Sequence, residues 1–176
     1  METPAELATE RLVLRKPVRE DARAIYDGYA RDPEVIRYLA FAGAQTMEDV
    51  EKFLDRALHG WDAGTILTWA ITLRPEGTLI GMIDVRLESH ANVGYVLARA
   101  YWNRGYTTEA LRAVVQWAMG QPEIFRLWAV CDVENAASAR VMEKAGMECE
   151  GILRRWTVLP NRSDMPRDCY CYSIVK

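Results

Sequence analysis

Hydrophobic residues recur along the chain with two different periods, and each change of period marks a new structural element. Short alternating or continuous apolar runs predict strands, whereas apolar residues three and four positions apart predict helices. The predicted strands are Arg11–Arg15, Ile66–Leu73, Thr78–Leu87, Asn92–Ala98, Arg126–Cys131 and two C-terminal segments near 149–159 and 168–175. The predicted helices are residues 20–31, Pro33–Leu39, Thr46–His59, Gly105–Met119 and Asn135–Ala145.

Local signals mark the ends of several of these elements. Thr46 with Asp49 three residues later is typical of a helix start, and Gly146 follows the last predicted helix as a C-terminal glycine. Residues 74–77, with sequence RPEG, are typical of a hairpin turn. A strand–helix–strand–helix block inside a largely antiparallel sheet predicts an α+β (mixed α/β) fold. No linker interrupts the chain, so we expect one domain over residues 1–176.

Composition narrows the class of protein. The 176 residues carry a net charge of −3 and are 50% hydrophobic, which excludes a disordered chain, a fibre and a disulfide scaffold. No apolar run approaches the roughly 18 residues of a membrane helix, and the mild acidity argues against a general nucleic-acid binder. The first residues lack a basic, then apolar, leader. We therefore expect a cytoplasmic protein with neither a membrane nor a nucleic acid as partner.

The cysteines and tryptophans give weaker signals. The four cysteines form no C-x-x-C pair and the two histidines lie far from them in sequence, which predicts buried, reduced thiols and no metal site. The cysteines are Cys131, Cys149, Cys169 and Cys171. Trp117 and Trp128 lie in segments that look buried, and we expect both in the core.

The segment Tyr101–Ala110, with sequence YWNRGYTTEA, joins a predicted strand to a predicted helix. Gly105 permits a tight turn, and the first helical turn offers free N–H groups at the positive end of the helix dipole. With Arg104 beside it, this arrangement can hold a phosphate or pyrophosphate. An ordinary helix cap with a solvated arginine has the same sequence features. Neither of the glycine-rich nucleotide motifs is present.

The segment Asp132–Met147 begins a second helix after a strand. Asn135 is suited to cap that helix, and its side chain can also bond a ligand amide. Ser138 falls in the first turn, where its hydroxyl can donate to a group lying across the end of the helix.

Together these two segments resemble the GNAT superfamily of acyl-CoA-dependent N-acyltransferases, and within it the RimJ/RimL branch, which acetylates N-terminal amines of ribosomal proteins. The similarity also covers Thr9–Arg15, Leu79–Gly81 and Val93–Leu97, in the family's order and spacing. It implies the GNAT fold, a mostly antiparallel twisted sheet in which one parallel pair of strands splays apart, with flanking helices. It implies acetyl-CoA as co-substrate and a primary amine as acceptor.

The resemblance also implies roles for particular residues. The loop and helix start at Arg104, Gly105, Tyr106, Thr107 and Thr108 would hold the pyrophosphate of coenzyme A. The pantetheine arm would lie in the splayed gap and pair with Val96, Leu97 and Ala98, with a backbone N–H near Leu97 polarising the thioester carbonyl. Asn135 would bond the pantetheine arm, and Ser138 would lie near the sulfur.

The sequence departs from the family pattern at three positions. Thr107 stands where the family often has Ala or Gly, but its N–H remains for an anion. Met142 stands where many members carry a tyrosine acid, which leaves Ser138 as the proton donor to the thiolate. Asn92 stands where relatives often carry a glutamate base. His90 and Glu88 are the candidate bases nearby, and either is equally well explained as a surface residue.

The resulting hypothesis is acetyl transfer to a primary amine by direct attack in a ternary complex. A missing strong base favours an acceptor of low pKa, such as a protein N-terminal α-amine near 7.7–8.0, over a lysine near 10.4. Three alternatives remain open: an N-acyltransferase of small amines, a coenzyme A-binding module with weak turnover, and a nucleotide at the anion site. The protein is expected to act as a monomer or a homodimer.

Overall fold

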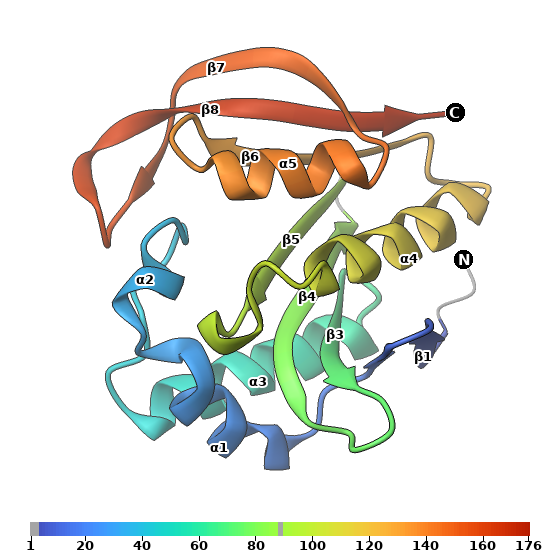
Figure 1. The fold of residues 1–176 in the computed structure, drawn as a ribbon, viewed down its shortest axis with the longest axis vertical. Coiled ribbons are helices and arrows are strands. Elements are labelled where there is room, and N and C mark those ends of the chain that lie inside the picture. Colours follow the sequence, from blue (N-terminus) through green and yellow to red (C-terminus); the bar gives the residue numbers. More distant parts are fainter. Residues whose placement is uncertain (1–3, 88–89) are drawn as a thin grey trace.

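The computed structural model describes residues 4–87 and 90–176 and is built on one eight-stranded sheet (Figure 1). The strand order is β1-β2-β3-β4-β5-β6-β8-β7, and every neighbouring pair is antiparallel except β5 and β6. The strands are β1 (Glu6–Ala8), β2 (Leu12–Arg15), β3 (Ile66–Leu73), β4 (Leu79–Leu87), β5 (Ala91–Leu97), β6 (Arg126–Asp132), β7 (Glu148–Leu159) and β8 (Ser163–Val175). The α+β prediction and the GNAT fold implied by the family resemblance are both confirmed.

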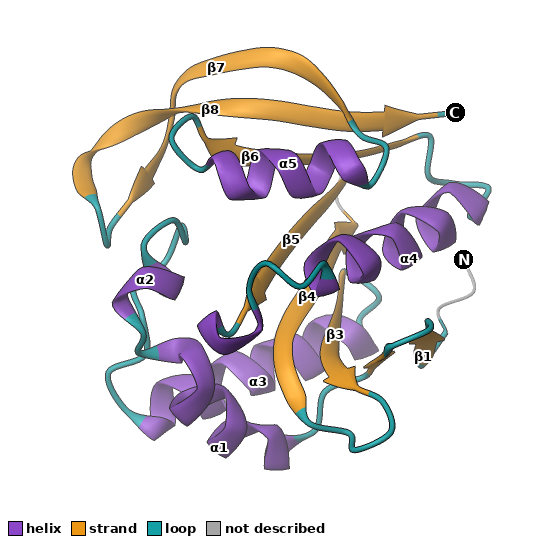
Figure 2. Ribbon diagram, in the orientation of Figure 1, coloured by secondary structure: helices purple, strands orange, loops and turns teal. Residues whose placement is uncertain are grey.

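Helices cover both faces of the sheet (Figure 2). The helices α4 (Tyr106–Gly120) and α5 (Ala136–Lys144) lie on one face, and α1 (Ala22–Ile25), α2 (Pro33–Ile36) and α3 (Met47–Asp62) lie on the other. Alternation along β3 and β4 sends their apolar side chains to two separate cores. On β3, for example, Trp69 packs in the core under α4, whereas Ala70 faces the core under α1–α3.

The parallel pair β5 and β6 opens like a V (Figure 1). The two strands pair only at Ala91 with Leu127 and at Asn92 with Trp128, although β5 continues to Leu97. Beyond Asn92, one edge of β5 therefore has no strand beside it, while its other edge stays paired with β4 as far as Leu97.

Several predicted elements differ from the structure. The short edge strand β1 was not predicted, because three residues are too few to show a period. Residues 20–31 do not form one helix: a 3-10 turn, η1 (Arg19–Asp21), precedes α1, and a π-helical segment, η2 (Tyr26–Ala30), follows it. A further 3-10 turn, η3 (Arg99–Tyr101), follows β5. The last strand begins at Ser163 rather than near 168, since the hairpin turn is tighter than its Pro-Asn sequence suggested.

Two burial predictions were partly wrong. Trp117 is buried, but Trp128 is only half-buried, because alternation on β6 turns Leu127 and Ala129 to the core under α5 and Trp128 to the other face. The cysteines are all free, and three are buried, whereas Cys149 is exposed on β7.

The β7–β8 hairpin reaches back to the N-terminal half of the chain. Asn161 Nδ2 donates hydrogen bonds of 2.8 Å to the carbonyls of Ile36 and Phe41. The guanidinium of Arg162 lies 4.8 Å from the centre of the Tyr38 ring. We call these contacts of Asn161 and Arg162 the α2–hairpin clamp. Asn161 and Ile36, which the clamp joins, lie 125 residues apart in the sequence.

Candidate active site

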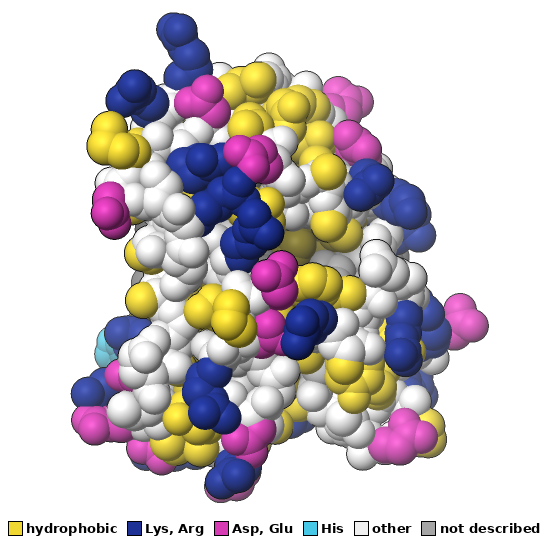
Figure 3. Space-filling model, turned by 60° about the vertical axis from the view of Figure 1, so that its left-hand side comes forward, with side chains coloured by type: hydrophobic (Ala, Val, Ile, Leu, Met, Phe, Trp, Pro, Cys, Tyr) yellow, Lys and Arg dark blue, Asp and Glu magenta, His cyan; other side chains and the backbone are white. Residues whose placement is uncertain are grey.

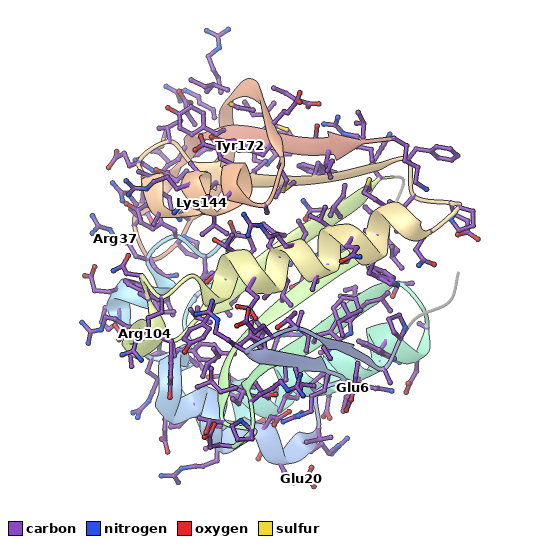
Figure 4. All side chains as sticks on the ribbon, turned by 45° about the vertical axis from the view of Figure 1, so that its right-hand side comes forward. Glu6, Glu20, Arg37, Arg104, Lys144 and Tyr172 are labelled. Atoms are coloured by element: carbon purple, nitrogen blue, oxygen red, sulfur yellow. The ribbon has the colours of Figure 1, made fainter. Side chains whose placement is uncertain are left out.

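The start of α4 is shaped by Gly105, which has the left-handed φ of 79° that glycine adopts readily. No side chain caps this helix, so the N–H groups of its first turn, at Tyr106, Thr107 and Thr108, have no side-chain partner at the N-cap. They carry the positive end of the dipole of a 15-residue helix. The predicted anion-binding residues therefore come together here, and Figure 4 shows Arg104 in the loop that leads into α4.

The beginning of β2 holds this loop in place. Arg11 Nη1 donates a 3.0 Å hydrogen bond to the Arg104 carbonyl, and Arg11 Nη2 lies 2.6 Å from Glu109 Oε2. Glu109 also accepts from Thr9 Oγ1 at 2.6 Å. Burial of Glu109 opposes its ionisation, but these hydrogen bonds outweigh it and lower its pKa. Arg11 thus neutralises the carboxylate nearest the helix start, which leaves the site favourable for an anion.

The backbone of β5 has two different edges. The Ala98 N–H donates a 2.8 Å hydrogen bond to the Ile80 carbonyl, so this residue is engaged with β4. Because backbone groups alternate along a strand, Val96 also faces β4, and Leu97 faces the open gap. The Leu97 carbonyl accepts from Trp102 Nε1 at 2.8 Å. Of the three residues predicted to pair with a ligand in the gap, Leu97 is the one that the structure turns toward it.

The start of α5 lies across the gap from β5. Asn135 caps the helix: its Oδ1 accepts from the Ser138 N–H at 3.1 Å. Ser138 Oγ lies 2.7 Å from the hydroxyl of Tyr95, which projects from β5. Burial raises the pKa of Tyr95 further above its ordinary value, so its hydroxyl stays protonated. Sequence analysis did not single out Tyr95 as a site residue, because one tyrosine in an apolar strand gives no signal of its own.

On the face that carries α1–α3, a cavity of about 500 Å³ lies over the closed end of the V. Its walls are Arg86, His90, Asn92, Arg126, Trp128, Glu150, Leu153 and Cys171. His90 is exposed and precedes β5. At about 3.3 Å per strand residue, His90 lies roughly 17 Å from Tyr95, which contacts Ser138, and roughly 23 Å from Leu97. The structure therefore does not bring His90 to Ser138, and Glu88 lies outside the described residues.

A carboxylate that was not predicted as a site residue lies on β4, two residues before Arg86 of this cavity wall. Asp84 is on β4, opposite Thr68 on β3 and Gly94 on β5. Its Oδ1 is buried and accepts no hydrogen bond, and Arg86 Nη2 lies 3.1 Å from that atom. Burial raises the pKa of Asp84 to about 6, although the charge of Arg86 acts in the opposite direction.

Residues 4–87 and 90–176 contain no cluster of three or more His, Cys, Asp or Glu side chains that could hold a metal ion. Within the same ranges, no helix is both long and apolar enough to cross a membrane.

Comparison with known proteins agrees with this arrangement. Residues 11–148 match the model of the acetyltransferase (GNAT) domain. The N-acetyltransferase YoaA of Bacillus subtilis (strain 168), whose role is uncharacterised, is 32% identical over 179 residues, which cover 97% of this chain and 96% of YoaA. The solved structure of a GNAT-family acetyltransferase from Bacillus anthracis is 29% identical and superposes with a TM-score of 0.84, covering 97% of this chain and 98% of that chain.

A more distant structure has the same fold. RimL, a ribosomal L7/L12 α-N-protein acetyltransferase solved with coenzyme A, is 18% identical and has a TM-score of 0.86, with 97% of each chain covered. The fold and its matches define a class, the acyl-CoA-dependent acyltransferases. The chain belongs to the GNAT acetyltransferase family, and it is an acetyl-CoA-dependent N-acetyltransferase.

Proposed function

We propose that this enzyme moves the acetyl group of acetyl-CoA to a protein N-terminal α-amine by direct attack in a ternary complex. The observation that carries the proposal is the V between β5 and β6, which opens beside the uncapped start of α4. The V connects the two faces of the sheet, so a thioester from the α4–α5 face can meet an amine from the α1–α3 face.

The cofactor-binding residues divide between the two helix starts. Arg104, Gly105, Tyr106, Thr107 and Thr108 hold the pyrophosphate of coenzyme A through backbone N–H groups and the helix dipole. The Leu97 N–H in the gap polarises the thioester carbonyl, and Asn135 bonds the pantetheine arm. Val96 and Ala98, also predicted to contact the pantetheine arm, support this edge through their backbone pairing with β4.

Ser138 acts as proton donor to the departing thiolate. Its hydroxyl is placed by Tyr95, which lies within hydrogen-bond distance of it. A thiol with a pKa near 8.5 leaves as thiolate at little cost at pH 7, so this donor contributes about 2 kcal/mol at 1.4 kcal/mol per pKa unit. Met142 is fully buried and has no proton to donate, which is consistent with Ser138 in this role.

The choice of an α-amine rests on acid–base chemistry. An α-amine has a pKa near 7.7–8.0, so a useful fraction is the free base at pH 7, whereas a lysine amine near 10.4 is almost fully protonated. The distant structural neighbour RimL is an α-N-protein acetyltransferase by its description. A modest base is therefore sufficient for the proposed acceptor and insufficient for lysine.

Replacing Gly105 by tryptophan is the direct test of the cofactor site. We expect calorimetric titration with acetyl-CoA to show micromolar binding by the wild type and at least 20-fold weaker binding by Gly105→Trp. The bulky side chain obstructs the anion site, and residue 105 needs a positive φ. Gly64→Trp is the matched control, since Gly64 also has a positive φ, of 66°, but follows α3. Equal affinity of Gly105→Trp and Gly64→Trp for acetyl-CoA would contradict the assignment.

A small amine is the second candidate acceptor, and the α2–hairpin clamp favours it. Asn161 joins the two sides of the molecule that flank the open end of the V, and Tyr38 donates to the Glu134 carbonyl at 3.4 Å. Figure 3 shows basic side chains gathered next to acidic ones on this side of the molecule. Contacts that join the two sides of an acceptor entrance limit the size of an acceptor more strictly than an open groove does.

An acceptor screen separates the two candidates. We expect peptides with a free N-terminus to be acetylated at the α-amine, with kcat/KM at least tenfold above that of the same peptides carrying only a lysine amine. Mass spectrometry of the products locates the acetyl group. The matched control is each peptide with its N-terminus blocked. Acetylation of only polyamines, amino acids or other small amines would contradict the peptide acceptor and support the second candidate, a small amine.

A further inference from the structure

We propose that Asp84 is the general base that removes the proton from the attacking amine, a role that rests on the function proposed above. The carboxylate lies on the face of α1–α3, from which the amine approaches. It is also the acidic side chain of β4 that lies directly beside β5. The position two residues before Gly94, where the family often has glutamate, is Asn92 in this chain.

The first argument is the geometry between β4 and β5. Asp84 pairs across the sheet with Gly94, and a Cβ built on Gly94 would lie 3.5 Å from Asp84 Oδ1. The carboxylate therefore lies over β5, at ordinary van der Waals distance from the place that a Cβ at residue 94 would take. Gly94 lies three residues before Leu97, or about 10 Å along the strand. The amine, one bound water and the aspartate side chain together bridge this span.

The second argument is the hydrogen bonding of Asp84. Oδ2 accepts from Arg86 Nη2 at 3.2 Å, whereas the buried Oδ1 accepts no hydrogen bond from the described residues. Arg86 Nη2 forms an ion pair with Oδ1 at 3.1 Å but no hydrogen bond to it, and a buried acceptor without a hydrogen bond is expected where a ligand or a proton completes the site. Oδ1 is thus available to accept a proton.

The third argument is the arrangement around Arg86. Its Nη1 donates to Asn92 Oδ1 at 3.0 Å, and Asn92 Nδ2 donates to the Trp128 carbonyl at 3.2 Å, where β5 joins β6. Asn92 therefore positions Arg86, and Arg86 positions Asp84. A carboxylate at residue 92 would compete with Asp84 for this single guanidinium, so the asparagine and the aspartate are complementary.

The groups packed around Asp84 determine its titration. Its strand neighbours Thr68 and Gly94 are uncharged. From the α1 side, Ala22 and Ile25 are buried, and the charged Arg23 is exposed and bonded to Asp27. Arg86 is the charge that acts on Asp84, and burial prevails over it to raise the pKa to about 6. Near pH 7 the carboxylate is ionised and able to take a proton.

The reaction step balances as follows. The amine nitrogen attacks the thioester carbonyl carbon, the new C–N bond forms and the C–S bond breaks. The proton from the amine passes through the water to the carboxylate of Asp84, and the thiolate takes its proton from Ser138 Oγ, which regains one from solvent. Asp84 then releases its proton to solvent, and the enzyme returns to its starting state.

The test uses any amine that the wild-type enzyme acetylates. Failure of the proposed α-amine acceptor can therefore be told apart from failure of Asp84 as the base. We expect Asp84→Asn to lower kcat/KM at pH 7 at least 100-fold, with the Kd for acetyl-CoA within twofold of wild type. The matched control Asp55→Asn removes an exposed carboxylate of α3 and keeps wild-type activity. Asp84→Asn with kcat/KM within threefold of wild type would overturn the proposal.

The pH dependence of kcat/KM distinguishes a catalytic role of Asp84 from a structural one, because a purely structural role would leave the shape of the profile unchanged. For an α-amine acceptor, log kcat/KM of the wild type should fall with slope 1 below the amine pKa of about 8 and with slope 2 below about pH 6, where Asp84 also protonates. In Asp84→Asn the second break disappears, whereas in His90→Ala and Ser138→Ala it remains. Loss of that break in His90→Ala would transfer the role to His90.

Arg86→Gln is a second variant that keeps the carboxylate. Removing the cation beside Asp84 removes the influence that lowers its pKa, so the second break should move to higher pH. An unchanged break in a folded Arg86→Gln protein would overturn the assignment even if Asp84→Asn proved too unstable to purify. Thermal unfolding of each variant, measured beside Asp55→Asn, confirms that the proteins compared are folded.

Discussion

Replacing Arg167 by methionine should lower the free energy of unfolding by about 3 kcal/mol at pH 7. The side chain of Asp132 is 0% exposed, and Arg167 bonds both of its carboxylate oxygens, from Nε to Oδ2 and from Nη2 to Oδ1. Arg167 Nη2 also lies 2.7 Å from Glu134 Oε1. The variant leaves a buried carboxylate without its guanidinium, which is far more costly than losing an exposed ion pair.

The effect should depend on pH with a defined sign. Burial of Asp132 opposes its ionisation, but the hydrogen bonds from Arg167 and the Glu134 N–H outweigh it and place the pKa below its ordinary value. A carboxyl whose pKa is lower in the folded state than in the unfolded state stabilises the protein at pH values above its unfolded pKa of about 3.9. This stabilisation is lost as the pH falls from the unfolded pKa through the folded pKa. The difference between wild type and Arg167→Met should therefore shrink below about pH 4.

Urea unfolding at pH 7 and at pH 3 measures both parts of this prediction. Arg154→Met is the matched control, because Arg154 is exposed on β7, and we expect it to change stability by less than about 0.5 kcal/mol. In the double variant Asp132→Asn/Arg167→Met the loss should be smaller than in Arg167→Met alone, since no buried charge remains. This prediction is contradicted if Arg167→Met lowers the free energy of unfolding by less than about 1 kcal/mol at pH 7, or if the loss at pH 3 equals the loss at pH 7.

Replacing Gly81 by alanine should also lower the free energy of unfolding by about 3 kcal/mol. A Cβ on Gly81 would lie 2.3 Å from the Val96 carbonyl oxygen and 3.1 Å from the Leu97 Cα. Both neighbours are backbone, so no side chain can rotate away, and β4 and β5 must separate. The same shift would displace Leu97 from the edge of the V, so we expect kcat to fall at least tenfold in the fraction that folds.

Gly120→Ala is the control for this prediction. Gly120 ends α4 with nothing within 4 Å of the position that a Cβ would take, so alanine there should leave stability unchanged or raise it slightly. Thermal unfolding and a turnover assay on both proteins distinguish the steric effect from a general effect of adding a methyl group. Equal stability and equal kcat for Gly81→Ala and Gly120→Ala would contradict the close approach of β4 and β5.

The sequence predicted most of the elements because their signals are local. The capping pair Thr46 and Asp49, the turn at residues 74–77 and the glycine before α4 depend on residues within a few positions of each other. The family resemblance added the arrangement of these elements, and the matches confirm the family. The broken first helix and the early start of β8 were not predicted. The β7–β8 turn is held by Asn161, whose partners Ile36 and Phe41 lie far away in sequence.

The amino-acid sequence by itself determined the fold class and, through the family resemblance, the enzyme family, and it predicts an anion site at the helix start after Gly105. Each of these follows from local pattern or motif. Only the tertiary structure decided which side chains meet across the sheet. It placed Tyr95 beside Ser138 and Asp84 over Gly94, and it left His90 far along β5 from Leu97. These relations depend on strand register and on the face to which each residue points, and no spacing along a single chain encodes either.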